Sequence, residues 1–243
     1  MLAGAVVAAA SGGDDGLSSA VKVELLGTPR PAETSGVAGA TGQATAGQTA
    51  TPRPAPPVLT GFVYPIDGGC LPEDDALMAG APRDYRNGIH EGVDFYDADN
   101  CTSIGLGTEV LAARPGTVIR ANWDYQELTP EELADLEERS QLDGFDPEIE
   151  DAYRGRQVWV DHGSGVVTRY AHLSGVAEGI EVGKRVNKGE PIAYVGESGT
   201  PESVTDPGYE YHLHFEIRVG DGYLGEGLSP DEVRGLYEEA FSE

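Results

Sequence analysis

The seven residues Tyr211-His212-Leu213-His214-Phe215-Glu216-Ile217 alternate between polar and apolar side chains over most of their length. Such alternation is typical of a β-strand, because successive side chains point to opposite faces of a sheet. We therefore expect Leu213 and Phe215 in the core, while His212 and His214 point together to the other face. Two neighbouring imidazoles could share a metal ion or a water molecule. The alternative is a pair of polar residues on a solvated face.

A second stretch, His90-Glu91-Gly92-Val93-Asp94, carries the same kind of chemistry. If it is extended, His90, Gly92 and Asp94 share a face, and the glycine leaves room between the two larger residues. Zinc accepts imidazole nitrogen and carboxylate oxygen as ligands. Two histidines and one carboxylate would leave the fourth position open, which is the pattern of a catalytic rather than a structural zinc site.

Short apolar runs between glycines and prolines predict the remaining strands. They lie at residues 61–65, 109–113, 116–123, 157–161, 166–173, 191–195 and 212–219. The turn at residues 162–165 joins two of them as a hairpin. This spacing predicts a mainly antiparallel β domain.

Two helices are predicted from capping patterns. Thr129-Pro130-Glu131-Glu132 begins the first, whose apolar stripe is limited to Leu133 and Leu136. Residues 123–153 contain 12 acidic residues and one basic residue, so we interpret this region, up to about residue 155, as a solvated acidic insertion outside the core. Ser229-Pro230-Asp231-Glu232 begins the second helix, whose apolar face is expected to pack on the sheet.

Three motifs occur in a characteristic order: His90-x-x-x-Asp94, Tyr170-Ala171-His172-Leu173-Ser174 and His212-Leu213-His214-Phe215-Glu216. Together with the glycine-containing segments at residues 160–165 and 182–196, these motifs resemble the lysostaphin-type (LytM-like) zinc metallopeptidases over roughly residues 85–220. The resemblance implies an antiparallel β-sheet or barrel-like domain of the lysostaphin (duplicated hybrid motif) type. The helical acidic insertion and the C-terminal helix are additions to it.

The resemblance also implies the roles of individual residues. The ligands of one zinc ion per chain would be His90, Asp94 and His214. His212 would be the catalytic histidine and His172 a second one. No His-Glu-x-x-His motif is present to supply a glutamate base, so a histidine is the natural base.

The remaining candidates are weaker. Glu216 shares a face with His214 on a regular strand and is a candidate hydrogen-bond partner for it. His162 lies in a turn, where a stabilising or solvent-facing role explains it. Tyr85, Tyr170 and Tyr211 could line the cleft, although strand aromatics are more often packing residues.

Two departures from the family pattern concern the substrate. The loop of residues 196–210 is longer than usual, and the acidic insertion is extra. We expect both to flank the cleft, so the substrate preference of the family does not carry over. By charge alone, an acidic rim favours a cationic or neutral peptide.

Two functions follow from these residues. The first is a zinc endopeptidase acting on peptide stems or crosslinks of peptidoglycan. The alternative is a non-catalytic LytM-like domain that binds cell-wall peptides or regulates another hydrolase. The complete ligand set favours the enzyme. A third interpretation, a carrier domain, fits less well. A lipoyl or biotinyl carrier would need a lysine at an exposed hairpin tip, and none is clearly placed there. A phosphocarrier would use two histidines without a zinc-binding aspartate.

Composition excludes other partners. The 243 residues include 16 basic and 42 acidic residues, for a net charge of −26. Such a chain lacks the basic face that nucleic acid requires, and it is unsuited to an anionic membrane surface. Without an apolar run of about 20 residues, an ordinary membrane-spanning helix is also excluded. We expect a monomer.

The N-terminal region is predicted to contain an export leader followed by a linker. Residues 1–26 form a leader whose apolar run at 2–10 lacks a preceding basic residue, as in a truncated export signal. Residues 27–60 are a Pro/Gly/Thr-rich linker expected to be disordered, and residues 61–243 form the domain. We expect an extracellular or cell-envelope location. Two cysteines in an exported protein favour one disulfide, between Cys70 and Cys101. In the chain-entropy model it would raise the free energy of unfolding by roughly 3–4 kcal/mol.

Overall fold

The computed structural model describes residues 59–143 and 146–242. The predicted leader, and all but the last two residues of the predicted linker, lie outside the described residues. No helix within the described ranges is long and apolar enough to cross a membrane.

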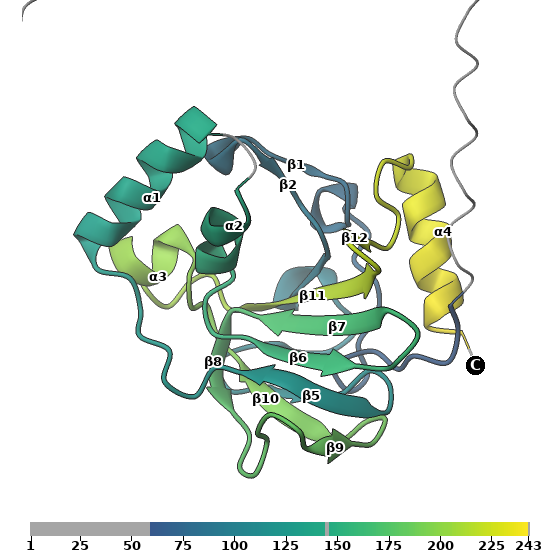
Figure 1. The fold of residues 1–243 in the computed structure, drawn as a ribbon. Helices are drawn as coiled ribbons and strands as arrows, with labels where there is room; N and C mark the ends of the chain where they lie inside the picture. The colour runs from purple at the N-terminus through teal and green to yellow at the C-terminus, as the bar shows by residue number, and fades with distance from the viewer. Residues whose placement is uncertain (1–58, 144–145, 243) are drawn as a thin grey trace, which may run out of the picture. The chain divides into compact units, whose positions relative to one another are not determined.

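Antiparallel strands dominate the described chain (Figure 1). They are β1 (Pro82–Arg83), β2 (Gly88–Ile89), β3 (Val93–Tyr96), β4 (Glu109–Leu111), β5 (Gly116–Ala121), β6 (Val158–Asp161), β7 (Val166–Ala171), β8 (Leu173–Val176), β9 (Arg185–Val186), β10 (Pro191–Val195), β11 (His212–Val219) and β12 (Gly222–Tyr223). The helices are α1 (Pro130–Asp143), α2 (Pro147–Tyr153), α3 (Pro201–Thr205) and α4 (Pro230–Ala240), with single 3-10 turns η1 (Asp75–Leu77), η2 (Asp84–Arg86) and η3 (Asp97–Asp99).

The largest sheet runs in the order β12-β11-β7-β6-β5-β9, and β3 pairs with β11. A smaller sheet has the order β4-β10-β8, and β1 pairs with β2. All of these pairings are antiparallel, as the sequence predicts, and the sheets of the described residues are not closed into a barrel. Leu213, Phe215 and Ile217 of β11 are fully buried in the core.

One predicted strand is divided by a histidine. The sequence predicts a single strand at residues 166–173, but β7 ends at Ala171 and β8 begins at Leu173. Between them, His172 has a φ of +58°, in the left-handed region that interrupts an extended chain. The turn directs β7 into the large sheet and β8 into the small one, and it places the His172 side chain where the two sheets meet.

The prediction of a strand at residues 61–65 is wrong. The Gly61 and Phe62 amides donate to carbonyls at the end of the C-terminal helix, and the Val63 amide donates to the Ala113 carbonyl. Because these bonds go to different elements, no strand ladder forms.

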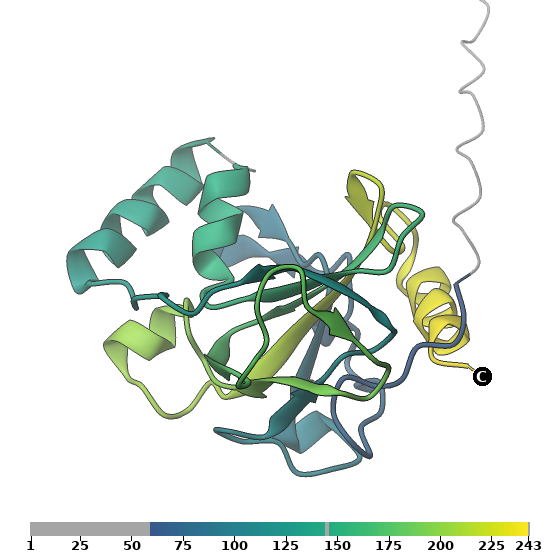
Figure 2. The same cartoon turned by 60° about the horizontal axis from the view of Figure 1, so that its bottom comes forward.

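The C-terminal helix α4 begins as predicted. Ser229 and Glu232 form a capping box, and Val233, Tyr237 and Ala240 are buried. In two views α4 lies on the opposite side of the sheets from α1, α2 and α3 (Figures 1 and 2). Its role is therefore packing, at a distance from the helices that flank the cleft described below.

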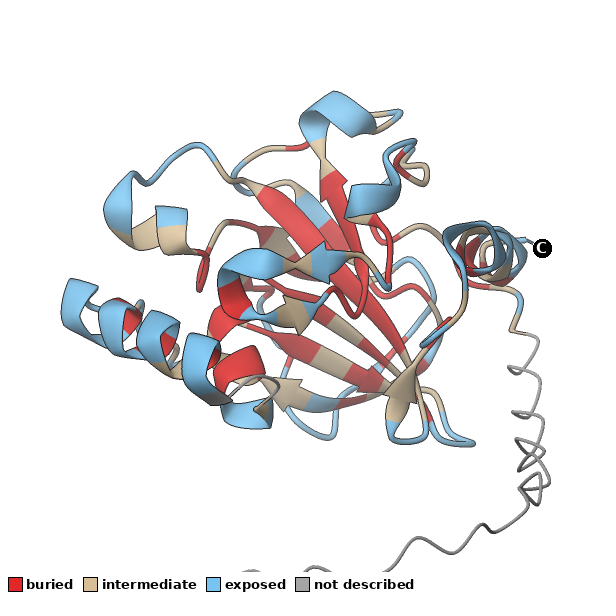
Figure 3. Cartoon of the chain, turned by 90° about the horizontal axis from the view of Figure 1, so that it is seen from above, coloured by how far each residue is buried: buried red, intermediate tan, exposed pale blue. Residues whose placement is uncertain are grey.

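The acidic insertion carries α1 and α2 and has a small core of its own, made by Leu136, Ile149 and Tyr153. Most of α1 is exposed, whereas buried residues follow the strands (Figure 3). This small core is separate from the main core, and a buried contact attaches the insertion to the rest of the domain. Arg86 of η2 forms a buried ion pair with Glu150 of α2, which ties the insertion to the segment before His90.

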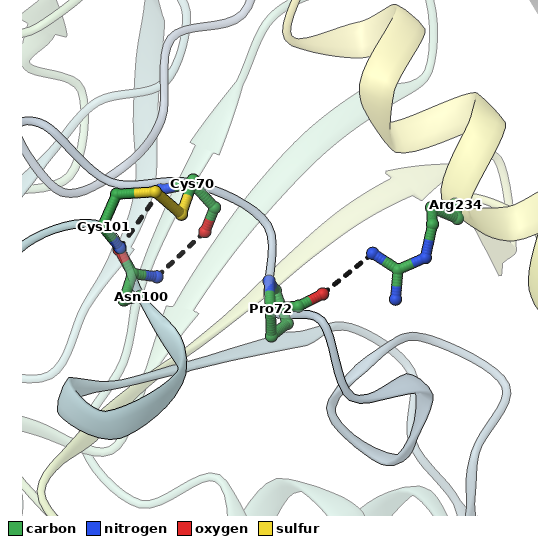
Figure 4. The surroundings of a disulfide bond; sticks show 5 residues. All are labelled: Cys70, Pro72, Asn100, Cys101 and Arg234. Atoms are coloured by element: carbon green, nitrogen blue, oxygen red, sulfur yellow. Dashed lines mark hydrogen bonds between the residues drawn. A yellow bond between two sulfur atoms is a disulfide. The ribbon is translucent and has the colours of Figure 1, made fainter.

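The disulfide pairs Cys70 with Cys101 (Figure 4). The Asn100 side chain closes the same corner, because its amide nitrogen donates to the Cys70 carbonyl at 2.9 Å and its oxygen accepts from the Cys70 amide at 3.2 Å. Beside it, Arg234 of α4 donates to the Pro72 carbonyl at 2.8 Å. The bridge therefore joins the two ends of the segment that carries His90 and Asp94.

Candidate metal centre

His90 is held by its backbone and its ring. Its amide donates to the Ala81 carbonyl at 2.8 Å, and its carbonyl accepts from the Gly80 amide at 2.7 Å. Its Nδ1 lies 3.0 Å from the Met78 carbonyl oxygen. The predicted continuous extended stretch is absent, since β3 begins only at Val93, but the bend at residue 92 still brings His90 onto Asp94.

Asp94 and His214 are placed opposite each other by the pairing of β3 with β11. The two backbones approach closely at Gly92, where a Cβ atom would lie 2.4 Å from the Phe215 carbonyl oxygen. Only glycine fits there. The glycine of the first motif is thus required by the neighbouring strand, in addition to leaving space between the two candidate ligands.

Three side-chain atoms converge at this point. His90 Nε2 lies 2.9 Å from Asp94 Oδ1 and 3.0 Å from His214 Nδ1. His214 Nδ1 lies 2.8 Å from the same carboxylate oxygen. All three residues are buried, and they form a group that could hold a metal ion.

The second nitrogen of each ring decides what the converging atoms can do. A carbonyl oxygen only accepts, so His90 Nδ1 carries the proton that it shares with Met78, and Nε2 is left as an acceptor. His214 Nε2 lies 3.1 Å from the Glu216 carboxylate, which likewise leaves Nδ1 as an acceptor. Two imidazole lone pairs and a carboxylate oxygen then face one another, and this donor set fits a zinc ion.

The charges of the centre follow from burial and mutual contact. Burial lowers the pKa of His90 to about 4 despite the nearby Asp94 carboxylate. Burial alone would raise the pKa of Asp94, but His90 and His214 hold it well below its ordinary value. Burial would lower the pKa of His214, but hydrogen bonds to Asp94 and Glu216 raise it above the ordinary value.

Glu216 links His214 to a buried group of arginines. Its carboxylate accepts from Arg154 Nε at 2.5 Å and from Arg218 at 3.2 Å. Arg154 also contacts Glu91, the residue next to His90. Burial opposes ionisation of Glu216, but Arg154 and its neighbours hold the pKa of Glu216 well below its ordinary value. The carboxylate is therefore charged and available to the Nε2–H group of His214.

His212 lies on the same face of β11 as His214. Its Nδ1 lies 2.6 Å from the Glu210 carbonyl oxygen, so its Nε2 is an acceptor, and this atom lies 3.9 Å from Asp94 Oδ1. His172 makes the matching contact through Nδ1, at 2.8 Å from the Ser198 carbonyl oxygen. Burial lowers the pKa of both histidines, so both are neutral near pH 7.

The four histidines open into a cleft of about 570 Å³. Tyr153 and Glu137 of the acidic insertion line this cleft, and so do Pro201 and Glu202 of α3. The insertion and the long loop therefore both flank the site, as expected from the sequence. The unexpected helix α3 lies within that loop and is capped by Thr200, whose hydroxyl accepts from Ser203.

Of the remaining residues that the sequence suggested, Tyr85 lines the cleft and the others do not. Tyr85 lines the cleft and is exposed, whereas Tyr170 is fully buried, and its hydroxyl accepts from the Ala113 amide at 2.8 Å. Tyr211 packs partly buried against the core and does not line the cleft. His162 also lies away from it, between the Pro115 carbonyl at 2.9 Å and the Thr168 hydroxyl at 2.8 Å.

Three residues at the centre, Arg83, Tyr96 and Glu210, were not predicted from the sequence. Arg83 of β1 donates to Asp94 Oδ2 at 2.9 Å, so the second oxygen of the carboxylate is also bonded. Tyr96 stacks on His212, and its hydroxyl donates to Glu210 at 2.9 Å. No spacing rule marks Arg83 or Glu210, because a hairpin and a loop bring them to the centre. Tyr96 follows Asp94 by two residues on β3, so strand alternation does place it on the same face.

Comparisons with known proteins agree with the motifs. The family model described as Peptidase family M23 matches residues 88–225. Peptidoglycan DD-endopeptidase ShyA of Vibrio cholerae serotype O1 is 37% identical over 67 residues, which are 28% of this chain and 14% of that protein. The match thus spans only a small part of this relative.

Two solved structures are also similar. A zinc-containing peptidase from Vibrio cholerae is 22% identical, with a TM-score of 0.40, over 67% of this chain and 38% of that one. The catalytic domain of the antimicrobial peptidase lysostaphin from Staphylococcus simulans is 22% identical, with a TM-score of 0.38, over 66% of this chain and 88% of that one.

Proposed function

The chain belongs to peptidase family M23, and from this premise we propose that it is a zinc-dependent endopeptidase that cuts peptide bonds in the stem peptides or crosslinks of peptidoglycan. The observation that carries the proposal is the convergence of three acceptor atoms, from His90, Asp94 and His214, within 4.8 Å of one another. Three lone pairs that face one another are stabilised by a shared cation.

The three residues would hold the zinc ion, and the open side of the centre faces the cleft. A zinc ion held there supplies Lewis acidity and lowers the pKa of water toward about 7. Met78 and Glu216 orient the two ligand imidazoles through their second ring nitrogens. Such partners fix the tautomer and raise the basicity of the ligand.

His212 is proposed as the general base. Its imidazole is neutral, and its Nε2 is an acceptor directed toward the centre. It can therefore remove a proton from the attacking water and return it to the leaving amine.

His172 is proposed as the second catalytic histidine. Because its Nδ1–H donates to the Ser198 carbonyl, its Nε2 is an acceptor in the neutral state. This arrangement favours orienting the water over donating a hydrogen bond to the oxyanion, the two roles that the sequence leaves open.

The substrate and location belong to the same proposal. ShyA is a peptidoglycan DD-endopeptidase, and a peptidoglycan peptide is the substrate that this relative suggests. A disulfide fits an oxidising environment, so we place the protein outside the cytoplasm, at the cell envelope or beyond it. We propose that it acts as a monomer.

Metal analysis of the full chain tests the proposal first. The wild type is expected to carry about one zinc ion per chain, and His214→Ala close to none, because a ligand is lost. His162→Gln is the matched control, since His162 lies outside the cleft, and it should keep its zinc. A wild type that binds no zinc, even when zinc is supplied, would overturn the proposed function.

Hydrolysis distinguishes the enzyme from the alternative, a non-catalytic module that binds cell-wall peptides. New amino termini released from purified peptidoglycan are measured by mass spectrometry. His212→Ala should retain zinc but lose hydrolysis by about 10²–10⁴-fold, as expected for removal of a general base. Binding of peptidoglycan by a zinc-loaded wild type without release of amino termini would favour the alternative.

A further inference from the structure

Tyr96 is the residue of β3 that lies directly opposite His212 of β11. Directly opposed residues of an antiparallel pair project from the same face and touch. Here the two rings are stacked, with centroids 4.3 Å apart and planes inclined by 11°. His212 also contacts the ring of His172, with centroids 4.5 Å apart and planes inclined by 42°. The His212 imidazole is therefore in contact with two other rings.

Glu210 closes the contact between Tyr96 and His212. Its side-chain Oε2 accepts from the Tyr96 hydroxyl at 2.9 Å, and its backbone carbonyl accepts from His212 Nδ1 at 2.6 Å. Its own amide donates to the Glu197 carboxylate at 3.1 Å. One residue thus connects the stacked phenol to the hydrogen bond that selects the tautomer of His212.

We propose that Tyr96 and Glu210 are positioning residues that hold the His212 imidazole with Nε2 directed at the metal centre. The inference rests on the proposed function, because His212 is the base of that reaction. A histidine ring rotates about χ2 between two broad orientations, and only one of them presents Nε2 to the centre. Stacking resists the rotation, and the Tyr96–Glu210 bond keeps the accepting carbonyl in place.

The arrangement differs from ordinary packing in where its polar atoms lie. Tyr96 and Glu210 both line the cleft, and neither belongs to the fully buried core. The hydroxyl could have faced solvent, but it bonds to the residue that also holds His212. Loss of the pair is therefore expected to disturb the orientation of the base more than the fold.

Four variants of the full chain test the inference. Tyr96→Leu removes both the stacking and the hydroxyl, Tyr96→Phe removes the hydroxyl alone, and Glu210→Ala removes its acceptor. Tyr125→Phe is the matched control, since Tyr125 donates to Glu127 at 2.7 Å outside the cleft. For each variant we would measure zinc content, kcat and KM on peptidoglycan peptides, and the His212 tautomer by long-range proton–nitrogen NMR.

Tyr96→Leu is expected to lower kcat by about tenfold, because misplacement of a catalytic group by about 1 Å can cost up to 10²-fold. KM and zinc content should stay unchanged, and the His212 spectrum should change from the Nδ1–H tautomer to an average of both. Tyr96→Phe and Glu210→Ala should each lower kcat by a few-fold. The control should match the wild type.

An unchanged kcat and tautomer in Tyr96→Leu would overturn the inference, and so would a loss of zinc or of folded structure in all three cleft variants, which would indicate packing alone. If Tyr96→Leu alone fails to fold, Tyr96→Phe and Glu210→Ala decide. If a zinc-loaded wild type hydrolyses nothing, the proposed function fails, and the tautomer measurement still decides whether Tyr96 positions His212.

Discussion

At the scale of single residues, the centre is organised by the nitrogen atoms that do not face it. His90, His172, His212 and His214 each give one ring nitrogen to a protein acceptor, three of which are backbone carbonyls. The other nitrogen is then fixed as an acceptor. Spacing in the sequence predicts which histidines meet, but not these partners, because Met78, Ser198 and Glu210 contribute backbone atoms that every residue type carries.

Arg83 gives a prediction at this scale. Arg83 donates to Asp94 Oδ2, so Asp94 Oδ1 stays free to bind the metal ion together with His90 and His214. Arg83→Gln removes the guanidinium that orients this carboxylate. We expect zinc to bind about tenfold more weakly, in line with other partners of metal ligands. Competition with a chromophoric chelator measures the dissociation constant.

Arg139→Gln makes the same change of charge on the exposed side of α1 and should leave zinc affinity as it is. Tighter zinc binding by Arg83→Gln would contradict the prediction, because the charge of the arginine would then oppose the metal more than its hydrogen bond orients the ligand.

At the scale of elements, alternation and capping patterns identify β11, the hairpin of β6 and β7, and the starts of α1 and α4. These signals are local, and so they could be read from the sequence. The break at His172 could not, because a positive φ in a non-glycine residue is imposed by the two sheets that the chain joins. The position of the acidic insertion on the domain depends on ion pairs between residues far apart in the sequence, such as Arg86 with Glu150. No local sequence pattern predicts such pairs.

Glu150→Ala tests how the insertion is attached. The side chains of Arg86 and Glu150 are only 7% and 3% exposed, so the substitution leaves a buried guanidinium without its counterion. We expect the free energy of unfolding to fall by about 3 kcal/mol. Denaturation in urea measures the change. Glu138→Ala, on the exposed surface of α1, should change stability little, and an equal loss in both variants would count against the attachment.

At the scale of the whole molecule, the buried histidines make stability depend on pH. The pKa values of His90, His172 and His212 are lowered by burial, that of His90 to about 4. The unfolded chain binds protons at these residues from about pH 6.5 downward, while the folded chain does not, so stability falls as the pH falls. Burial also lowers the pKa of His162, so His214, whose pKa is raised, opposes the trend as one histidine against four.

The metal-free protein should therefore melt at a lower temperature at about pH 5.5 than at about pH 8, a range in which ordinary carboxylates stay charged. Thermal unfolding followed by circular dichroism in the presence of a chelator measures the difference. An equal or higher melting temperature at the lower pH would show that the buried imidazoles accept protons in the folded state.

The pairing of β3 with β11 also has a consequence during synthesis. His214 follows Asp94 by 120 residues, so a ribosome that adds about 5–20 residues per second makes the last donor roughly 6–24 s after the others. Throughout that interval the growing polypeptide has two of its three donors and lacks both His212 and the strand that aligns them. A nascent or prematurely terminated chain therefore has an incomplete set of metal-binding side chains, and the set is completed only by the last strands of the large sheet.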